Sequence, residues 1–112
     1  RRIVFNIAVS NCDDHLRNHG FLLTPQGWRL SPAYDINPDE YGTGLKLNIS
    51  ENDNSLDFDL PMSITPYFGL EPARAESILA EVKRVVSGWR KLATKYGIPK
   101  SEQDTMARAF RY

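Results

Sequence analysis

Apolar and polar residues occupy separate blocks in the first third of the chain. Residues 1–9 are two arginines followed by a nearly continuous apolar run. Residues 10–19 are mostly polar, which predicts a loop. Periodicity alone cannot decide between a buried helix and a buried strand for so short an apolar run. Two further apolar segments, 21–23 and 28–30, flank the Thr-Pro-Gln-Gly segment 24–27. A link of this length with Pro and Gly predicts a β-hairpin.

The pattern in the middle of the chain is weaker. Apolar residues alternate with polar ones over 45–49, which predicts a short, half-buried strand. Residues 51–54 hold two carboxylates and two amides, but they lack the spacing of a calcium loop and predict a polar turn. Residues 57–69 predict a short helix, with Pro61 early in it and Pro66 disturbing it.

The clearest pattern is helical. Apolar residues recur with a period near 3.6 between positions 78 and 89, as a helix with one buried face requires. Pro72 suits the first turn of this helix, and Gly97 suits its end. The Ser-Gly pair at 87–88 should bend it, because glycine inside a helix costs about 1 kcal/mol relative to alanine. A last helix should start after Ser101, whose hydroxyl can cap free backbone amides. The apolar face consists of Ile78, Leu79, Val82, Val85, Val86 and Trp89.

These elements predict an α+β, mostly α-helical fold, and 112 residues suffice for one domain with one modest core. The net charge is zero, but residues 1–70 carry −4 and residues 71–112 carry +4. The acidic half suits cation binding. The basic half could contact nucleic acid or an acidic partner, or form a solvated helix face.

Several absences narrow the class of protein. Cys12 is the only cysteine, so no disulfide forms within the chain, and a small packed residue is favoured over a reactive thiol. No apolar run approaches the roughly 20 residues of a membrane-spanning helix, so we expect no membrane partner and a cytoplasmic location. The chain starts without Met and inside an element, and we interpret residues 1–112 as a fragment of a longer protein. It holds no glycine-rich phosphate loop; Gly-Thr-Gly at 42–44 is only a weak match.

The candidate chemistry lies in the polar loop and just after the hairpin. Asp13, His15 and Asn18 stand close together in the loop, and Asp35 follows the second apolar segment. An aspartate five residues before an asparagine, with a second aspartate after a strand pair, is the arrangement by which ATP-dependent kinases place a base and two magnesium ligands. A carboxylate can accept the proton of a substrate hydroxyl, and hard oxygen ligands suit the divalent ion that balances phosphate charge.

The run Asp-x-His-x-x-Asn, followed by Ser-Pro-Ala-Tyr-Asp at 31–35, resembles the C-terminal half of HipA-like kinases. These are the serine/threonine kinase toxins of bacterial toxin–antitoxin modules. The resemblance implies a protein-kinase-like C-lobe, with a helix over residues 1–9 and a small β-hairpin bearing the metal aspartate. It implies ATP as co-substrate, Asp13 as the catalytic base, and a magnesium ion held by Asn18 and Asp35.

The resemblance also implies partners and a boundary. The partners would be a protein substrate and a helix-turn-helix antitoxin of the HipB type, with DNA engaged only indirectly through the antitoxin. The nucleotide-binding N-terminal lobe would lie outside residues 1–112, so we expect the isolated chain to be inactive. Arg17 stands where the family usually has lysine, which keeps the charge but changes the donor geometry. Asp14 is an extra carboxylate that the mechanism does not require.

Alternatives remain open for individual residues. Arg17 could contact the transferred phosphoryl group or form an ion pair with Asp13 or Asp14. His15 could shuttle a proton, although we favour a structural histidine that hydrogen-bonds the loop and holds Asp13. No chemical role is expected for His19. A zinc site through these carboxylates and histidines can also be drawn, but it lacks the spacings that structural zinc sites use.

Alternatives also remain for the whole chain. It could be a non-catalytic helical docking module for an antitoxin, or a lipid kinase, because Asp-x-His-x-x-Asn also resembles the catalytic loop of phosphoinositide kinases. A metal-dependent nuclease using Asp13, Asp14 and Asp35 is a more distant alternative. Trp28 and Tyr34 could stack on bases, but at strand ends they are more typical of core or hairpin packing.

Overall fold

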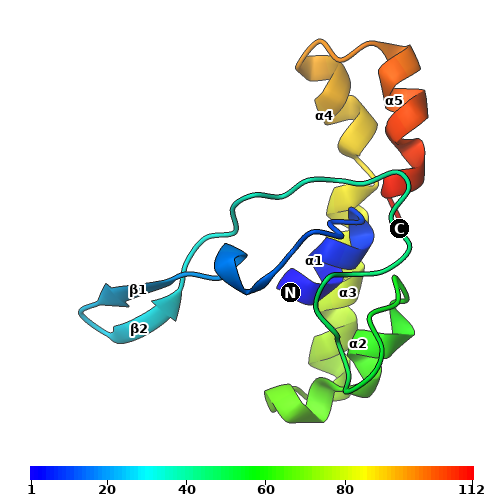
Figure 1. Ribbon diagram of the computed structural model, residues 1–112. Helices are drawn as coiled ribbons and strands as arrows, with labels where there is room; N and C mark the ends of the chain where they lie inside the picture. Colours follow the sequence, from blue (N-terminus) through cyan, green and yellow to red (C-terminus); the bar gives the residue numbers. More distant parts are fainter.

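The core of the molecule lies where its first helix packs against its longest one. The computed structural model describes residues 1–112, and in it α1 (Arg2–Ala8) packs against α3 (Pro72–Val86) (Figure 1). Their contact buries one apolar cluster, and removing that surface from water is the main source of stability. The cluster consists of Val4, Ala8, Val9, Val82 and Val86, with Phe5, Ile36, Phe58, Leu79 and Phe110 packed around it.

The apolar run at the start of the chain is helical, as the family resemblance implies. Ile7 and Ala8 are completely buried in α1, and Val4 is nearly so. A helix that is apolar on most of its sides is a buried helix rather than a surface one. Ser10, directly beyond it, has φ of 48°, in the left-handed region, and turns the chain into the polar loop.

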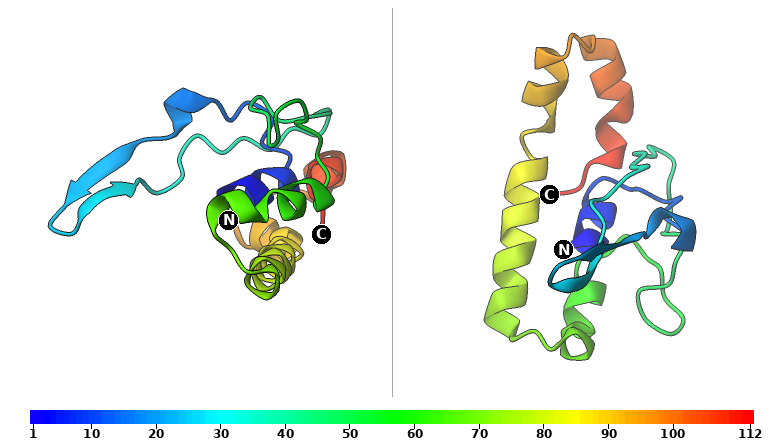
Figure 2. Two further views of the ribbon diagram at one scale, coloured as in Figure 1. Left: turned by 90° about the horizontal axis from the view of Figure 1, so that it is seen from below. Right: turned by 90° about the vertical axis from the view of Figure 1, so that its left-hand side faces the viewer.

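The predicted hairpin is present and is the most exposed part of the molecule. Its strands β1 (Phe21–Thr24) and β2 (Gly27–Leu30) are antiparallel. Gly27 has φ of 103°, a conformation that side chains rarely allow, so glycine makes this turn possible. The hairpin extends away from the helices (Figures 1 and 2). Because no second layer covers the strands, Trp28 is 70% exposed, so of the two expectations, core or hairpin packing, core packing was wrong. Trp28 stands opposite Leu23 in the hairpin.

The strand predicted over 45–49 is not formed. Its side chains do alternate between inner and outer positions, but its backbone has no neighbouring strand. Only one isolated antiparallel bridge, between Gly44 and Ser55, occurs in this region. Alternation reports which side chains are buried, whereas a strand also needs a partner that the local pattern does not specify. The predicted polar turn is present, with the Ile49 N–H donating to the Asp53 carbonyl at 2.7 Å.

The interrupted helix predicted over 57–69 occurs as two short pieces. α2 (Asp59–Ser63) contains Pro61, and a 3₁₀ helix (Thr65–Phe68) begins with Pro66 near its start. Proline fits the first turn of a helix because the N–H that it lacks has no partner there. Pro72 takes the first position of α3 for the same reason, as predicted.

The predicted bend at 87–88 separates α3 from α4 (Trp89–Lys95), and α5 (Lys100–Met106) returns beside α4 (Figure 1). The prediction that Ser101 caps α5 was wrong. Pro99 occupies the capping position, with no side-chain hydrogen bond, and its fixed φ starts the helix earlier. None of the helices combines the length and the apolar composition needed to cross a membrane.

Candidate functional site

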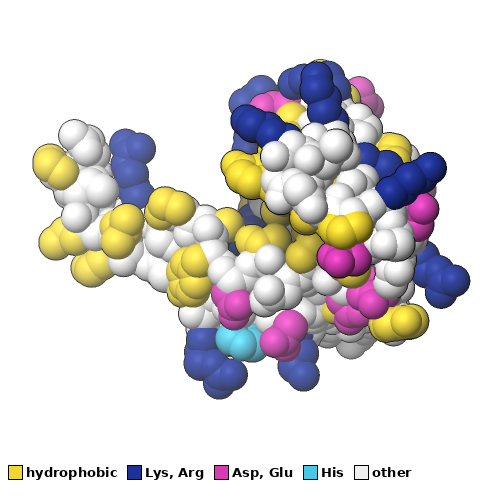
Figure 3. Space-filling view, turned by 90° about the horizontal axis from the view of Figure 1, so that it is seen from above, with side chains coloured by type: hydrophobic (Ala, Val, Ile, Leu, Met, Phe, Trp, Pro, Cys, Tyr) yellow, Lys and Arg dark blue, Asp and Glu magenta, His cyan; other side chains and the backbone are white.

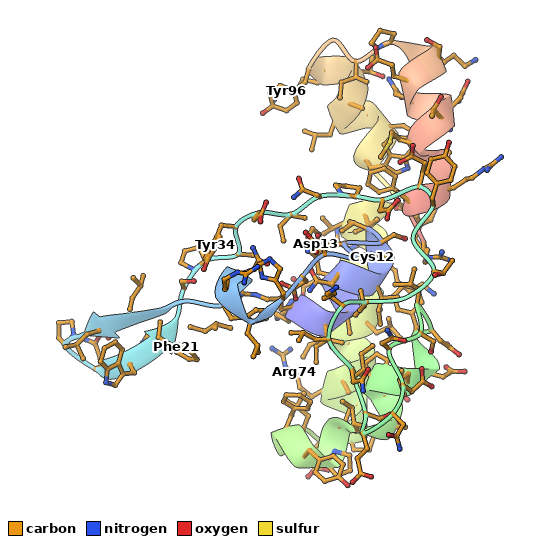
Figure 4. The ribbon with its side chains drawn as sticks, viewed as in Figure 1. Cys12, Asp13, Phe21, Tyr34, Arg74 and Tyr96 are labelled. Atoms are coloured by element: carbon orange, nitrogen blue, oxygen red, sulfur yellow. The ribbon has the colours of Figure 1, made fainter.

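The loop that follows α1 and the segment that returns from the hairpin are tied together at both ends. The Ser10 carbonyl accepts a hydrogen bond from the Asp39 N–H at 3.0 Å, and the Gly20 carbonyl accepts one from the Ser31 N–H at 2.8 Å. Between these ties, a 3₁₀ helix (Leu16–Asn18) forms inside the predicted loop. The two segments lie between the helical body and the hairpin and carry all the candidate site residues (Figure 4).

Asn18 and Asp35 are brought together by this arrangement. The Asn18 amide nitrogen Nδ2 donates to Asp35 Oδ2 at 2.8 Å, although the two residues are 17 positions apart. The amide oxygen of Asn18 accepts from the His15 backbone N–H at 3.1 Å, and the Asn18 side chain is 5% exposed. Both ends of this amide are therefore held, and its position is well defined relative to the carboxylate.

Asp35 combines an unusual backbone with a stabilised charge. Its φ of 54° lies in the left-handed region, where residues other than glycine cluster at functional sites because the surrounding structure must offset the strain. Asn37 Nδ2 donates to Asp35 Oδ1 at 2.8 Å, on the side of the carboxylate away from Asn18. Hydrogen bonds from Asn37 and then Asn18 hold the pKa of Asp35 below its usual range. Asp35 is thus an exposed, ionised carboxylate at neutral pH.

The other candidate residues of the loop are held less tightly. Asp13 is exposed, and its carboxylate takes part in none of these hydrogen bonds. Arg17 Nη2 lies 3.5 Å from His15 Nε2, and Arg17 makes no ion pair with Asp13 or Asp14. His15 does not hold Asp13 as expected; its Nδ1 is buried without a hydrogen-bond partner. The Tyr34 hydroxyl donates to the Arg17 carbonyl at 2.7 Å, which ties the 3₁₀ helix to the returning segment.

A second polar cluster, absent from the predictions, lies under the loop. Asp14 is only 7% exposed, and its carboxylate accepts a short hydrogen bond from Asn6 Nδ2 of α1. His19 Nε2 lies 3.0 Å from both oxygens of the same carboxylate. Asp14, for which the proposed mechanism has no role, therefore connects the loop to α1, and His19 has a structural role beside it.

Two more asparagines connect this buried cluster to the exposed pair. Asn11 Nδ2 donates to Asn6 Oδ1 at 3.2 Å, and Asn11 Oδ1 accepts from the Asn37 N–H at 3.0 Å. Asn37 in turn binds Asp35. One sequence signal could have revealed the buried cluster: Asn6 is the only polar residue between Ile3 and Val9, and a polar side chain inside a buried run needs a partner.

The donor set fits a hard cation better than zinc. No three side chains of His, Cys, Asp or Glu lie close enough together to share a metal ion, so the alternative zinc site is not formed. Asp35 offers an ionised, exposed carboxylate, and Asn18 Oδ1 keeps a second lone pair beside its hydrogen bond from the His15 N–H. Because Asn18 Nδ2 faces Asp35, the Asn18 amide would have to turn for both residues to bind one ion through oxygen. Magnesium is commonly held by one or two carboxylates together with waters and substrate phosphates.

Cys12 lies in this loop but is a packing residue. It is half-buried against Gly42, where a Cβ would come within 2.3 Å of the Cys12 sulfur. Burial, followed by the nearby charge of Asp39, raises the pKa of the Cys12 thiol. A neutral thiol is a poor nucleophile, in agreement with the expectation of a small packed residue.

The geometry of the loop and of the returning segment can now be set beside known proteins. A model of the HipA-like C-terminal domain matches residues 1–89, and the chain therefore belongs to this family. The match covers α1, the loop, the hairpin, Asp35 and all of α3, and it ends at the first residue of α4. Nothing among the curated proteins or the solved structures matches the chain.

Proposed function

We propose that this chain supplies the catalytic loop and the metal ligands of an ATP- and magnesium-dependent serine/threonine protein kinase. Membership of the HipA-like family supports this, because the family is that of kinase toxins in bacterial toxin–antitoxin modules. In the proposal the helical body and hairpin correspond to a kinase C-lobe. The protein works in the cytoplasm and is paired with a helix-turn-helix antitoxin.

The observation that carries the proposal is the pair formed by Asn18 and Asp35. Their side chains meet at 2.8 Å, and Asp35 is strained, exposed and ionised. Aspartate tolerates a left-handed backbone better than most residues, and residues in this region cluster at functional sites. A magnesium ion held here would neutralise the charge of the β- and γ-phosphates and align them.

The other loop residues have separate roles in the proposed reaction. The Asp13 carboxylate is free of competing hydrogen bonds and accepts the proton of the substrate hydroxyl. The hydroxyl oxygen of the substrate serine or threonine then bonds to the γ-phosphorus, and ADP departs. Arg17, exposed one residue before Asn18, contacts the transferred phosphoryl group. His15 acts as a positioning residue, because its backbone N–H fixes the Asn18 amide. Positioning and charge supply most of the rate in phosphoryl transfer.

Nucleotide binding needs more than these residues provide. Gly42, the first glycine of the weak Gly-Thr-Gly match, packs against Cys12, and Gly44 packs against Asn54. Neither is part of a phosphate loop that leads into a helix. We therefore assign transfer activity to the complete gene product and expect none from residues 1–112 in isolation.

The test is transfer of labelled phosphate from ATP by the complete gene product. Wild type should incorporate label into itself or a protein substrate with Mg²⁺ and not with EDTA. Asp13→Ala and Asp35→Asn should each lower the rate at least about 100-fold, because each removes a group that acts on the reacting atoms. Glu51→Ala removes an exposed carboxylate outside the site and serves as the matched control.

Two results would overturn the proposal. One is transfer by Asp13→Ala at the wild-type rate with an unchanged circular dichroism spectrum. The other is a wild-type protein that transfers no label, although it binds its antitoxin. The second result would favour the docking module, an alternative supported by the uncovered apolar surface of the C-terminal helices. Label found in lipid rather than protein would favour the phosphoinositide-kinase alternative.

A further inference from the structure

An apolar stripe continues along α3 and α4 beyond the point where it is covered. From Ile78 to Tyr96, successive apolar residues of the stripe are alternately four and three residues apart. This is the repeat of a helix face that packs against another helix. The first two positions belong to the core, but Val85 is 59%, Leu92 55% and Tyr96 73% exposed. The positions of the repeat are Ile78, Val82, Val85, Trp89, Leu92 and Tyr96. We call the last four residues the α3–α4 stripe.

The α3–α4 stripe borders a groove rather than a flat surface. Two adjoining hollows, of about 230 and 340 Å³, share Trp89, Leu92 and Phe110 as lining residues. The Trp89 and Phe110 rings, which line both hollows, stack with centroids 4.1 Å apart. Tyr96 lies at the far end of the helical pair in Figure 4. The groove therefore runs along the stripe from Val85 to Tyr96.

The groove continues an existing helix–helix interface. α1 covers the first half of the seam on α3, and Phe5 and Val9 of α1 line the first hollow. α4 follows α3 along the long axis of the molecule (Figure 2), and the residues that line the two hollows come from both helices. An unbroken helix from Val85 to Tyr96 would be about 16 Å long at 1.5 Å per residue, and the bend at 87–88 interrupts this stretch. Three turns of a second helix would cover it as α1 covers the part before it.

The charge beside the α3–α4 stripe is mostly basic, with one acidic residue, Glu102, lining the second hollow. Arg84, Lys91 and Lys95 directly precede Val85, Leu92 and Tyr96, and all three basic side chains are exposed. From residue 82 to residue 101 the chain has six basic residues and no acidic one. Several Lys and Arg side chains lie at the helical end of the molecule that faces the viewer in Figure 3, with some Asp and Glu side chains among them. A second copy would bring like charges together, so an occupant with acidic flanks is favoured.

We propose that the α3–α4 stripe docks an acidic amphipathic helix of a partner protein. The helix places apolar residues at positions i, i+3 or i+4, and i+7 in the groove, and its flanking Asp or Glu side chains face Arg84, Lys91 and Lys95. The proposal does not depend on kinase activity. The Asp13→Ala variant should bind such a helix as well as wild type does.

The test uses a defined probe, a fluorescein-labelled 21-residue peptide of three heptads with Leu at positions a and d and Glu at e and g. Binding is followed by fluorescence anisotropy. Leu92→Glu should weaken binding about tenfold or more, because it places a charge at the centre of the groove. The double variant Lys91→Glu and Lys95→Glu should weaken it about fivefold at low salt and less at 0.5 M salt.

Matched controls distinguish binding in the groove from non-specific binding elsewhere on the surface. Tyr67→Glu changes an aromatic residue that is more exposed than the stripe residues and remote from them, and Lys46→Glu reverses an exposed charge in the other half of the chain. Both should bind like wild type. The same peptide with Lys in place of Glu should bind at least about tenfold more weakly.

Other outcomes overturn the proposal. Equal binding of the Glu and Lys peptides would refute the electrostatic part of the proposal. No binding of the Glu peptide at millimolar concentration would refute the whole proposal. Sedimentation that shows a dimer abolished by Leu92→Glu would identify a second copy as the occupant. Salt-sensitive binding of duplex DNA, insensitive to Leu92→Glu but lost with the two lysines, would identify a nucleic-acid surface.

Discussion

Two buried asparagines, Asn6 and Asn18, each bond to an aspartate in this molecule, and the two pairs differ in how far the carboxylate is exposed to water. In both pairs an asparagine Nδ2 donates to an aspartate oxygen, and both asparagines are buried. Asp14, the partner of Asn6, is buried under the loop. Asp35, the partner of Asn18, is exposed. The same contact therefore stabilises the interior in the Asn6–Asp14 pair. In the Asn18–Asp35 pair it leaves an exposed carboxylate that can bind a ligand.

The backbone shows the same division. Asn6 belongs to a regular helix, and Asp14 lies in the loop directly above it. Asp35 has a left-handed backbone, which the chain adopts at only one other non-glycine position, Ser10. The Ser10 hydroxyl accepts a hydrogen bond from the Arg111 side chain at 3.2 Å, so the C-terminus helps to hold that turn. Strain is thus supported from outside in both places, as expected near a functional site.

Replacing each asparagine by alanine should separate the two pairs most clearly. Asn6→Ala leaves the buried Asp14 carboxylate with His19 as its one remaining side-chain partner, and we expect a loss of about 3 kcal/mol in the free energy of unfolding. Asn18→Ala should cost only about 1 kcal/mol, because water can replace the amide beside exposed Asp35. Urea denaturation followed by circular dichroism measures both values.

The control for this comparison is Asn48→Ala, which changes an exposed asparagine of the middle segment. It should alter the free energy of unfolding by less than about 0.5 kcal/mol. Equal losses for Asn6→Ala and Asn18→Ala would contradict the division, since they would mean that the two carboxylates are equally hydrated.

Features that depend on residues close together in the sequence could be predicted, whereas features that depend on distant residues could not. The hairpin and the starts of the helices depend on Pro and Gly within a few residues, and these predictions are confirmed at Gly27 and Pro72. The strand over 45–49 failed because its partner is not encoded locally. The juxtaposition of Asn18 and Asp35 was predictable from a motif with a short hairpin between its parts. The backbone of Asp35 was not, because only its packed surroundings impose a left-handed conformation.

The two histidines of the loop give a second, smaller contrast. His19 binds buried Asp14, whereas the His15 ring has only a long contact to Arg17. His19→Ala should cost about 1–2 kcal/mol of unfolding free energy, because it removes a hydrogen bond to a buried charged group. His15→Ala should cost less than about 1 kcal/mol, since its backbone N–H still holds Asn18. The same urea series measures both, and a larger loss for His15→Ala would contradict the assignment.

The smallest effect concerns the charge of Asp35 itself. Two amides lower its pKa, and the hydrogen bond from Asn37 contributes more than the one from Asn18. Removing either donor should raise the pKa towards the ordinary value of about 3.9, and Asn37→Ala should raise it further than Asn18→Ala. A carbon-detected NMR titration of the Asp35 carboxyl, in wild type and both variants, measures this shift. A larger shift for Asn18→Ala would contradict the order of the two causes.

The direction of the linked pH effect follows from the same shift. Because the pKa of Asp35 is lower in the folded than in the unfolded state, its stabilising contribution is present above the unfolded value and is lost as the pH falls through the folded value. Asn37→Ala should therefore flatten the acid limb of the stability curve without changing the plateau near neutral pH beyond the loss of one exposed hydrogen bond. Asp14 provides the contrast within the same protein. Its carboxylate is buried under the loop and bonded to Asn6 and His19, whereas the Asp35 carboxylate is exposed and can gain or lose a proton, or a cation, with the fold intact.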